Sequence, residues 1–529
     1  MRRTLHLFLA LTLLSAGSTG VAAPLGGPNE PPRNYPEFTY ERTRVEMRDG
    51  VELSVDIYRP VTPKNVKVPV ILQLTPYHSL YRALDPNETD LPAGDARLLV
   101  PKGYAYAVGD VRGTYNSGGC WDYGGIKERH DGYDLVEWLG TRSWSNRRVA
   151  MTGGSYDGTT ANAAAVERPP HLATIVPISA ISRWWGYAYQ QGARSTYSGE
   201  SADADPPSDT PTDFMFAYGF LPPPDPTAVT SAEQVAMRWD LCDRAEKLER
   251  GYLDPDYDRF WIERDYLRLA HRVNVPVLVT HGQLDFNVKT WEGTSWFEAL
   301  DTEKVLVMGQ WPHASPRGRY PDWDIFLERW YERWLYGVRN GVEREPSVRI
   351  QTNDNKWHEG DAWSAGGTER APITASAPRF SYLDDGALTE SEMLRGLGEG
   401  TRFIRAKVGH RPGTHLEGRP ILHLKAKSDS TESNFVAVLL DCGEASCRVV
   451  SRAFLDARYR DGLRRAKPLE PGKWYDLTLE FIDKSHVLEK GRRFELLIGS
   501  SSNTWVAPAR ERAANTLNLE DSYLVLPLR

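Results

Sequence analysis

Short apolar segments alternate with amphipathic stretches between residues 68 and 309, and this rhythm constrains the fold more than any other feature. Each segment holds six to eight residues and is rich in β-branched side chains, as expected of strands buried on both faces. Helical patterns separate the segments, for example at 131–139 and 159–166. This order predicts an α/β domain with a mostly parallel sheet. The six segments are Val68–Thr75, Tyr104–Asp110, Arg148–Gly153, Thr174–Ser179, Val275–His281 and Lys304–Gly309.

Two departures from this rhythm suggest how the chain is divided. From 184 to 269 the strand pattern stops, and a Pro- and Asp-rich stretch precedes a helical pattern. Such an insertion usually covers the carboxyl edge of the sheet, so we predict a helical cap there. From about 345 to 529 apolar and polar residues alternate with period 2, which is typical of an antiparallel β-sandwich. The α/β domain then comprises 24–183 and 270–344.

Residues 1–23 have the pattern of a secretory signal peptide. Arg2 and Arg3 precede an apolar run over 5–14, and small residues follow as far as Ala23. A membrane span needs about 20 apolar residues, so this run is too short, and no later stretch is long enough. The alternative is an uncleaved anchor. We expect a secreted protein.

The composition is that of a soluble globular protein, with 40% hydrophobic and 26% charged residues. The chain has 71 acidic and 64 basic residues, a net charge of −7, and no basic block. We therefore expect no nucleic-acid partner. We also predict no cofactor, and the sequence leaves a homo-oligomer open.

Four cysteines form an even set in a chain directed to an oxidising compartment, where pairing is the rule. Cys442 and Cys447 flank a short polar stretch, which predicts a disulfide at a hairpin tip and leaves Cys120 for Cys242. Zinc is the competing use of cysteine, but neither pair has the C-x2-C or C…H spacing of a zinc site. We predict two disulfides and no metal site.

The strand at 148–153 runs directly into Gly-Gly-Ser-Tyr-Asp-Gly at 153–158 and then into an Ala-rich helical segment. A serine on such a sharp strand-to-helix turn is strained, and it presents its hydroxyl above the sheet edge. Small neighbours are needed there because larger side chains would clash. The pattern predicts a nucleophile elbow with Ser155 as the nucleophile. The alternative is a Gly/Ser turn without chemistry.

Two later strands end in residues that could activate this serine. A serine hydroxyl needs a base, and the base needs an acceptor on its other ring nitrogen. Asp285 follows the strand at 275–280, and His313 follows the strand at 304–309. The order Ser, Asp, His is that of α/β-hydrolases. We predict a triad of Ser155, Asp285 and His313.

Acyl transfer also requires hydrogen-bond donors aimed at the developing oxyanion. The backbone N–H of Tyr156, directly after the predicted nucleophile, is one candidate. The second could be the hydroxyl of Tyr77, which follows the strand at 68–74 at the same sheet edge. Spacing alone does not separate this role from that of an ordinary core aromatic.

The chain resembles a group of serine hydrolases that joins Xaa-Pro dipeptidyl-peptidases (peptidase family S15), cocaine-esterase-like hydrolases and α-amino-acid ester hydrolases. The matching motifs are Gly-Gly-Ser-Tyr-Asp-Gly at 153–158, Asp-Val-Arg-Gly at 110–113, Thr-Pro-Tyr at 75–77 and the stretch 128–138. The resemblance implies an α/β-hydrolase fold with a helical cap insertion and a C-terminal jelly-roll β-sandwich domain. It implies the triad of Ser155, Asp285 and His313. It also implies that the Tyr77 hydroxyl and the Tyr156 amide form the oxyanion hole.

Within the group, His-Gly-Gln-Leu-Asp-Phe-Asn-Val-Lys at 281–289 is similar to the dipeptidyl-peptidase branch. The α-amino-acid ester hydrolases carry carboxylates two and three residues after the triad Asp, where this chain has Asn287 and Val288. We therefore predict cleavage of small peptide or amide substrates after a penultimate proline, through an acyl-enzyme. The alternative is a cocaine-esterase-like enzyme acting on small acyl or aryl esters, because Gln-Trp-Pro-His at 310–313 resembles those members.

Overall fold

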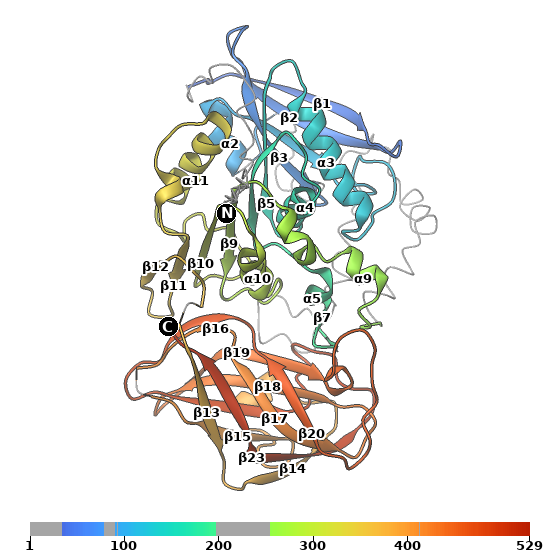
Figure 1. Ribbon diagram of the computed structural model, residues 1–529, viewed down its shortest axis with the longest axis vertical. Coiled ribbons are helices and arrows are strands. Elements are labelled where there is room, and N and C mark those ends of the chain that lie inside the picture. Colours follow the sequence, from blue (N-terminus) through green and yellow to red (C-terminus); the bar gives the residue numbers. More distant parts are fainter. Residues whose placement is uncertain (1–33, 79–89, 93, 197–253, 365, 412) are drawn as a thin grey trace, which may run out of the picture.

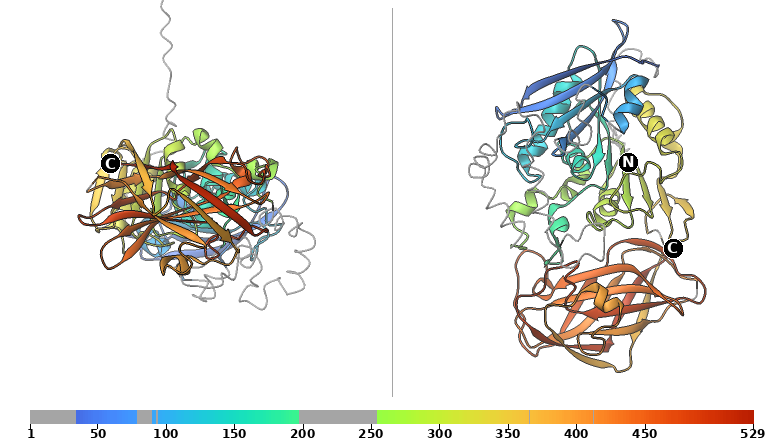
Figure 2. Two further views of the ribbon diagram at one scale, coloured as in Figure 1. Left: turned by 90° about the horizontal axis from the view of Figure 1, so that it is seen from below. Right: turned by 180° about the vertical axis from the view of Figure 1, so that it is seen from behind.

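The computed structural model describes residues 34–78, 90–92, 94–196, 254–364, 366–411 and 413–529. An α/β body and an all-β body are stacked along the long axis of the molecule (Figures 1 and 2). The predicted signal peptide and residues 197–253 of the predicted cap lie outside the described residues. Every helix in the described part of the chain is too short or too polar to cross a membrane.

A ten-stranded sheet forms the centre of the α/β body, in the order β1-β2-β4-β3-β5-β6-β9-β10-β11-β12. Neighbouring strands are parallel from β4 to β11, while β1 and β2 at one edge and β12 at the other pair antiparallel. Every residue of β4 and β9 is buried, as expected for central strands covered on both faces. The strands are β1 (Phe38–Glu46), β2 (Glu52–Pro60), β3 (Val68–Thr75), β4 (Ala105–Asp110), β5 (Ser145–Gly154), β6 (Leu172–Ile178), β9 (Val277–Gly282), β10 (Lys304–Gly309), β11 (Val348–Gln351) and β12 (Trp357–Gly360).

Helices cover both faces of this sheet (Figure 1). Because side chains of a strand alternate between faces, Val70 and Leu72 of β3 join the core beneath α3, α4 and α10, whereas Ile71 joins the core beneath α2 and α11. This two-sided packing is that of a parallel α/β sheet. The helices are α2 (Asp95–Leu99), α3 (Ile126–Gly140), α4 (Tyr156–Ala165), α10 (Trp291–Ala299) and α11 (Trp323–Tyr331), with the short helices η1 (Val100–Lys102), η2 (Leu267–Arg272), η3 (Glu332–Tyr336) and η4 (Val342–Arg344).

The strand order reverses around β3, which has β4 on one side and β5 on the other. In open α/β sheets, ligands bind at such a reversal, outside the carboxyl ends of the strands. The ends of β3, β5, β9 and β10 share this edge because all four strands are parallel. The sheet therefore brings together loops that are more than 200 residues apart in the sequence.

The all-β body is an antiparallel sheet in the order β19-β18-β22-β15-β13-β23-β17-β20, with β14 paired to β23. A bridge between Ala453 in β19 and Phe481 just after β20 joins the two edges, so the sheet nearly closes around its own core. Alternate residues of β17 are buried, as period-2 patterning predicts. The strands are β13 (Thr368–Thr374), β14 (Arg379–Asp384), β15 (Phe403–Val408), β17 (Ile421–Ser428), β18 (Asn434–Cys442), β19 (Cys447–Asp456), β20 (Tyr475–Glu480), β22 (Arg493–Gly499) and β23 (Ala513–Pro527), beside a small sheet of β16 (His415–Gly418) and β21 (Lys484–Val487) and the short helices α12 (Glu390–Leu394) and η5 (Ala457–Tyr459).

Strands β11 and β12 extend the first sheet, although they follow residue 345, where the sequence places the start of the sandwich. Short alternating strands look alike at the edge of an α/β sheet and in a sandwich, so periodicity does not separate the two. The parallel pairing of β11 with β10 assigns it to the first sheet.

The described ends of the predicted cap form short elements, of which the β7–β8 hairpin lies against β19 of the all-β body. They bury Trp184, Trp185 and Trp261 almost completely. The rings of these tryptophans contact the rings of Tyr123 and Tyr189. These elements are α5 (Trp184–Ala188), β7 (Tyr189–Gln190), β8 (Ala193–Arg194) and α9 (Arg259–Glu263).

Candidate active site

Ser155 occupies a strained turn between β5 and α4. Its backbone has φ 60° and ψ −122°, a conformation that non-glycine residues rarely adopt. A Cβ at Gly153, where φ is 148°, would lie 2.3 Å from the Cβ of Asp157, and a Cβ at Gly158 would lie 2.7 Å from the Gly153 carbonyl oxygen. Glycine is therefore required on both sides of the serine, which remains partly exposed at the sheet edge.

Two hydrogen-bond donors meet at this serine. The Tyr77 hydroxyl donates to Ser155 Oγ at 3.2 Å, and the Tyr156 backbone N–H donates to the Tyr77 hydroxyl oxygen at 3.4 Å. Tyr77 is in turn fixed by its own N–H, which donates to Thr75 Oγ1 at the end of β3 at 2.9 Å. The hydroxyl and the amide predicted to form an oxyanion hole thus lie next to each other and next to Ser155.

Asp285 and His313 form a pair at the ends of β9 and β10. His313 Nδ1 lies 2.7 Å from Asp285 Oδ2, and Asp285 Oδ1 accepts the backbone N–H groups of Asn287 at 3.0 Å and Val288 at 2.9 Å. Burial of Asp285 disfavours its charge, but the neighbouring His313 and these hydrogen bonds outweigh that effect, so the pKa of Asp285 lies below its usual value. A buried carboxylate is in place to orient the imidazole and to stabilise its protonated form.

His281 supports the loop that carries Asp285, a role that the sequence prediction missed. It is fully buried at the end of β9, its Nε2 lies 2.9 Å from the Val288 carbonyl oxygen, and the same nitrogen is 3.5 Å from Asp285 Oδ2. Burial lowers the pKa of His281, so the ring is held neutral. Its position within the motif at 281–289 was the available signal.

The all-β body holds the same loop from outside. The Ser485 backbone N–H on β21 donates to Gln283 Oε1 at 2.8 Å, and the Thr290 hydroxyl donates to the Asp483 carbonyl oxygen at 2.8 Å. The two contacts lie on either side of Asp285 in the chain. The position of the carboxylate therefore depends on both bodies of the molecule.

A buried carboxylate also fixes Tyr156, whose amide faces the site. The Tyr156 hydroxyl donates to Glu128 Oε2 at 2.5 Å and accepts the indole N–H of Trp121 at 2.7 Å. Burial and the nearby charge of Asp122 raise the pKa of Glu128 to about 7, despite the hydrogen bonds that it accepts. Glu128 opens the sequence stretch 128–138, but nothing in its spacing indicates a contact with the residue after Ser155.

Two buried lysines lie near the loop that carries Asp285, called here the acid loop. Burial lowers the pKa of Lys289 to about 8 and that of Lys484 to about 7, although the charge of Asp285 acts in the opposite direction on both. Lys289 Nζ donates to the Asn287 carbonyl oxygen at 3.2 Å. Lys484 therefore begins to lose its positive charge at neutral pH, and Lys289 about one pH unit higher.

The comparisons with known proteins identify the family of the chain. The family described as X-Pro dipeptidyl-peptidase (S15 family) matches residues 49–315, and the X-Pro dipeptidyl-peptidase C-terminal non-catalytic domain matches residues 411–525. The chain belongs to the S15 family of X-Pro dipeptidyl-peptidases. It is accordingly a hydrolase of the serine type. The first match contains Tyr77, Ser155, Asp285 and His313.

Two similar relatives align over most of their length. A putative Xaa-Pro dipeptidyl-peptidase of Bacillus anthracis is 27% identical over 93% of this chain and 87% of its own. One from Streptomyces avermitilis is 27% identical over 98% of this chain and 87% of its own.

Solved structures share the fold. An α-amino acid ester hydrolase is similar with a TM-score of 0.70 at 20% identity, over 98% of this chain and 100% of that one. A CocE/NonD family hydrolase from Staphylococcus aureus is similar with a TM-score of 0.73 at 16% identity, over 96% and 100%. The predicted α/β-hydrolase fold with a C-terminal β-sandwich is confirmed.

The cysteines follow the predicted pairing as far as the structure describes them. Cys442 and Cys447 are joined in a disulfide across the hairpin between β18 and β19. Cys120 is also disulfide-bonded, next to Trp121. Cys242 lies outside the described residues, so its pairing with Cys120 stays a prediction.

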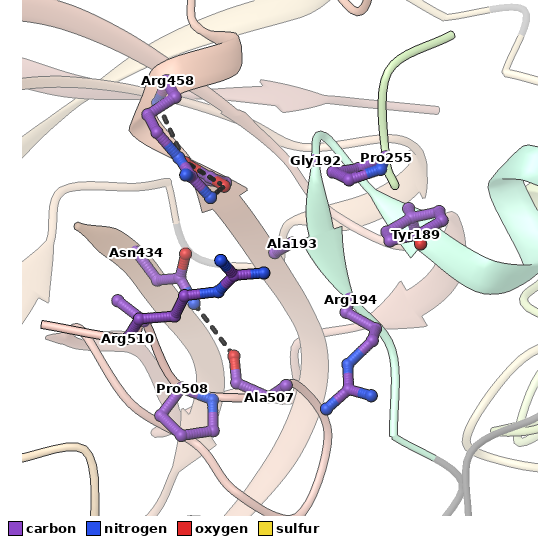
Figure 3. Close-up of a pocket in the computed structure, with 12 residues that line it drawn as sticks. Tyr189, Gly192, Ala193, Arg194, Pro255, Asn434, Arg458, Ala507, Pro508 and Arg510 are labelled. Atoms are coloured by element: carbon purple, nitrogen blue, oxygen red, sulfur yellow. Dashed lines mark hydrogen bonds and ion pairs between the residues drawn. The ribbon is translucent and has the colours of Figure 1, made fainter. Parts of the chain in front are cut away.

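A cavity of about 140 Å³ lies between the β7–β8 hairpin and the all-β body. Arg194, Arg458 and Arg510 surround it (Figure 3), and Arg458 is paired with Asp456 and with Glu432 at 2.7 Å each. The predicted catalytic and oxyanion-hole residues, all within the described part of the chain, do not line this cavity.

Proposed function

We propose that this member of the S15 family is a secreted Xaa-Pro dipeptidyl-peptidase that cleaves peptides after a penultimate proline through an acyl-enzyme. One observation carries the proposal. Hydrogen bonds link Tyr77 to Ser155 and to the Tyr156 amide at the carboxyl edge of the parallel sheet, and the His313–Asp285 pair lies at the same edge. Serine, base, orienting acid and two oxyanion donors are the groups that acyl transfer requires.

The proposal gives each group a role. His313 Nδ1 bonds to Asp285, and its Nε2 takes the proton of Ser155 as Oγ attacks the carbonyl carbon. The oxyanion that forms accepts hydrogen bonds from the Tyr77 hydroxyl and the Tyr156 N–H. The tetrahedral intermediate then collapses, the protonated His313 gives its proton to the leaving amine, and the acyl group stays on Ser155. Water, deprotonated by His313, hydrolyses that ester and restores the serine.

The choice of peptide over ester rests on the relatives and on the acid loop. Relatives that match nearly the whole chain are named putative Xaa-Pro dipeptidyl-peptidases. Two residues after Asp285, where the α-amino-acid ester hydrolases carry a carboxylate, this chain has Asn287. The side-chain oxygen of Asn287 accepts a hydrogen bond from the Tyr187 hydroxyl at 2.9 Å. This change favours the dipeptidyl-peptidase branch.

Secretion is supported by two features. Residues 1–23 carry the signal-peptide pattern, and the Cys442–Cys447 disulfide suits an oxidising compartment. Expression of the full chain in a bacterial host, followed by intact mass analysis, tests this part. We expect an exported protein that lacks its first 23 residues, and retention of the full-length chain in the cytoplasm would contradict it.

A substrate panel tests the activity. Purified enzyme is incubated with Ala-Pro and Ala-Ala anilides and with short-chain nitrophenyl esters, beside the Ser155→Ala variant and a fluorophosphonate probe. We expect Ala-Pro cleavage to dominate, Ser155→Ala to be inactive and the probe to label only the parent. Ester turnover without Ala-Pro cleavage would replace the peptidase assignment by the esterase one. Labelling and turnover that survive in Ser155→Ala would refute the triad itself.

A further inference from the structure

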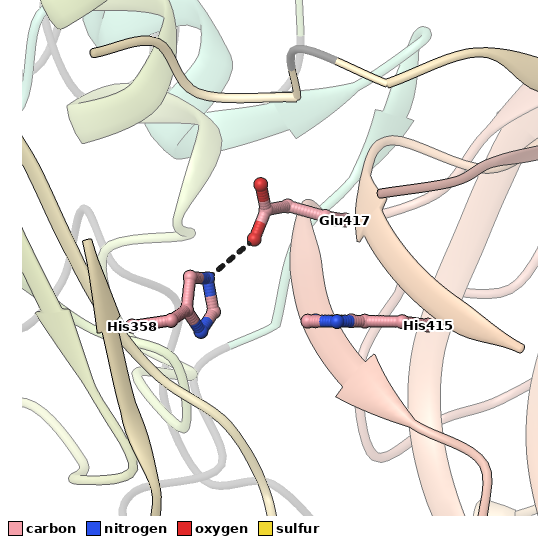
Figure 4. A group of neighbouring side chains, drawn as sticks. All are labelled: His358, His415 and Glu417. Atoms are coloured by element: carbon pink, nitrogen blue, oxygen red, sulfur yellow. Dashed lines mark hydrogen bonds and ion pairs between the residues drawn. The ribbon is translucent and has the colours of Figure 1, made fainter. Parts of the chain in front are cut away.

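Two histidines and a glutamate converge at the junction of the two bodies, away from Ser155 in the sequence and in the fold. His358 comes from β12, the edge strand of the first sheet, while His415 and Glu417 come from β16 of the all-β body. Because they are two residues apart on one strand, His415 and Glu417 point to the same side. Figure 4 shows the three side chains directed toward one another.

The distances suit a shared ligand. One ligand atom from each side chain lies within 4.8 Å of the others, and His358 Nε2 is 2.7 Å from Glu417 Oε2. Zinc bound at about 2.0–2.1 Å by nitrogen and oxygen holds its ligands roughly 3.4 Å apart. The atoms therefore lie close to the required spacing, and His358 Nε2 would exchange its hydrogen bond with Glu417 Oε2 for the metal. Two imidazoles and one carboxylate are ligands that zinc-like divalent cations prefer.

The carboxylate has an oxygen left for a metal. The hydrogen bonds and ion pairs that its side chain makes with His358, Ser485 and Arg529 all fall on Oε2. Its other oxygen, Oε1, takes part in none of these contacts. The Arg529 guanidinium, 3.3 Å from Oε2, can therefore keep its partner while Oε1 binds a cation. Glu417 is almost fully buried, and His358 and His415 are only partly exposed, so the site combines a buried anion with access from solvent.

We propose that His358, His415 and Glu417 form a site for a divalent cation of the zinc class, with water as the fourth ligand, which ties the α/β body to the all-β body. The inference does not depend on the proposed peptidase activity. Sequence reasoning predicted no metal site because the two histidines are 57 positions apart and only the fold unites them. Another group in the described part of the chain, Cys442, Cys447 and Glu495, is excluded because its sulfurs are bonded to each other.

Zinc titration by calorimetry, together with thermal melting, tests the site. The protein is first dialysed against a chelator, and all variants are made in a His313→Ala background so that zinc on the proposed catalytic imidazole is not counted. We expect one equivalent of Zn²⁺ to bind and to raise the melting temperature. His358→Ala and His415→Ala should each weaken binding by at least the roughly 10- to 100-fold that loss of a ligand's outer partner usually costs.

The matched control is His423→Ala. His423 lies on β17 and stacks on Tyr523 outside the cluster, so its loss should leave both the affinity and the zinc-induced shift unchanged. If either ligand variant fails to melt cooperatively, His358→Gln and His415→Gln, which keep a polar side chain, replace it in the same titration. Absence of zinc binding in the parent would overturn the proposal, as would equal affinities in the parent and in both ligand variants.

Discussion

Replacing Tyr77 by Phe removes one oxygen atom next to Ser155 and leaves the buried ring in place. Two donors, the Tyr77 hydroxyl and the Tyr156 amide, are proposed to share the oxyanion, and the amide remains in the variant. Loss of one oxyanion donor usually lowers kcat by about 10²- to 10³-fold, or roughly 2.7–4 kcal/mol in the barrier. The hydrogen bonds with Ser155 and Tyr156, at 3.2 Å and 3.4 Å, are long, so we expect their loss to lower the free energy of unfolding by only about 1 kcal/mol or less.

The measurement is kcat and KM for the Ala-Pro anilide, with urea unfolding in parallel. Tyr104→Phe is the matched control, because the Tyr104 hydroxyl is buried in the same body and has no hydrogen-bond partner among the described residues. We expect kcat to fall in Tyr77→Phe alone, with little change in KM. A kcat within about threefold of the parent would refute the role in the oxyanion hole, and a change confined to KM would mean that the hydroxyl binds the ground state and the transition state equally.

Gly153→Ala should lower stability by at least about 1–3 kcal/mol and abolish turnover, because φ is 148° there and the added Cβ would meet Asp157. Gly154→Ala is the control, because a Cβ there meets open space, and it should preserve both the melting temperature and the anilide turnover. Because burial raises the Glu128 pKa from 4.5 to about 7, this group makes the free energy of unfolding fall as the pH rises between those values. Glu128→Gln should remove that fall. Urea unfolding at about pH 5 and pH 7 measures it, and an equal change in the free energy of unfolding between the two pH values in parent and variant would contradict the prediction. Arg452→Ala breaks a buried bidentate ion pair with Glu390, at 2.6 Å in both bonds, and should cost about 3–5 kcal/mol in urea unfolding. The double variant Arg452→Met with Glu390→Met should regain much of that loss, and a double variant as unstable as Arg452→Ala would show that the ion pair was not the cause.

The buried strands and the loop residues at their ends were predictable from the sequence because both follow local rules. A strand covered on both faces is apolar throughout, as β9 is, and a serine between glycines after such a strand is confined to a sharp turn. The order of Ser155, Asp285 and His313 along the chain then suggested which strand ends meet. These inferences need only short stretches of sequence and the rule that parallel strands share an edge.

Contacts between distant segments could not be predicted in this way. Glu128 reaches the Tyr156 hydroxyl through the packing of α3 against α4, and His281 reaches the Val288 carbonyl because the loop folds back over the strand end. Glu128 carries no local pattern that reports its partner, whereas His281 shares the motif at 281–289 with Val288, whose carbonyl oxygen it contacts. The membership of β12 in the first sheet is likewise a property of strand pairing, and it alone brings His358 to the neighbouring body.

The all-β body contacts the loop around Asp285 through two hydrogen bonds, and these contacts affect how the chain can evolve. Substitutions near Asp483 and Ser485 can alter turnover without touching substrate, because they shift the loop that holds the proposed acid. The α/β body cut out alone would keep its serine and lose these two restraints on its acid. We therefore expect that replacing or removing the all-β body disturbs the proposed acid.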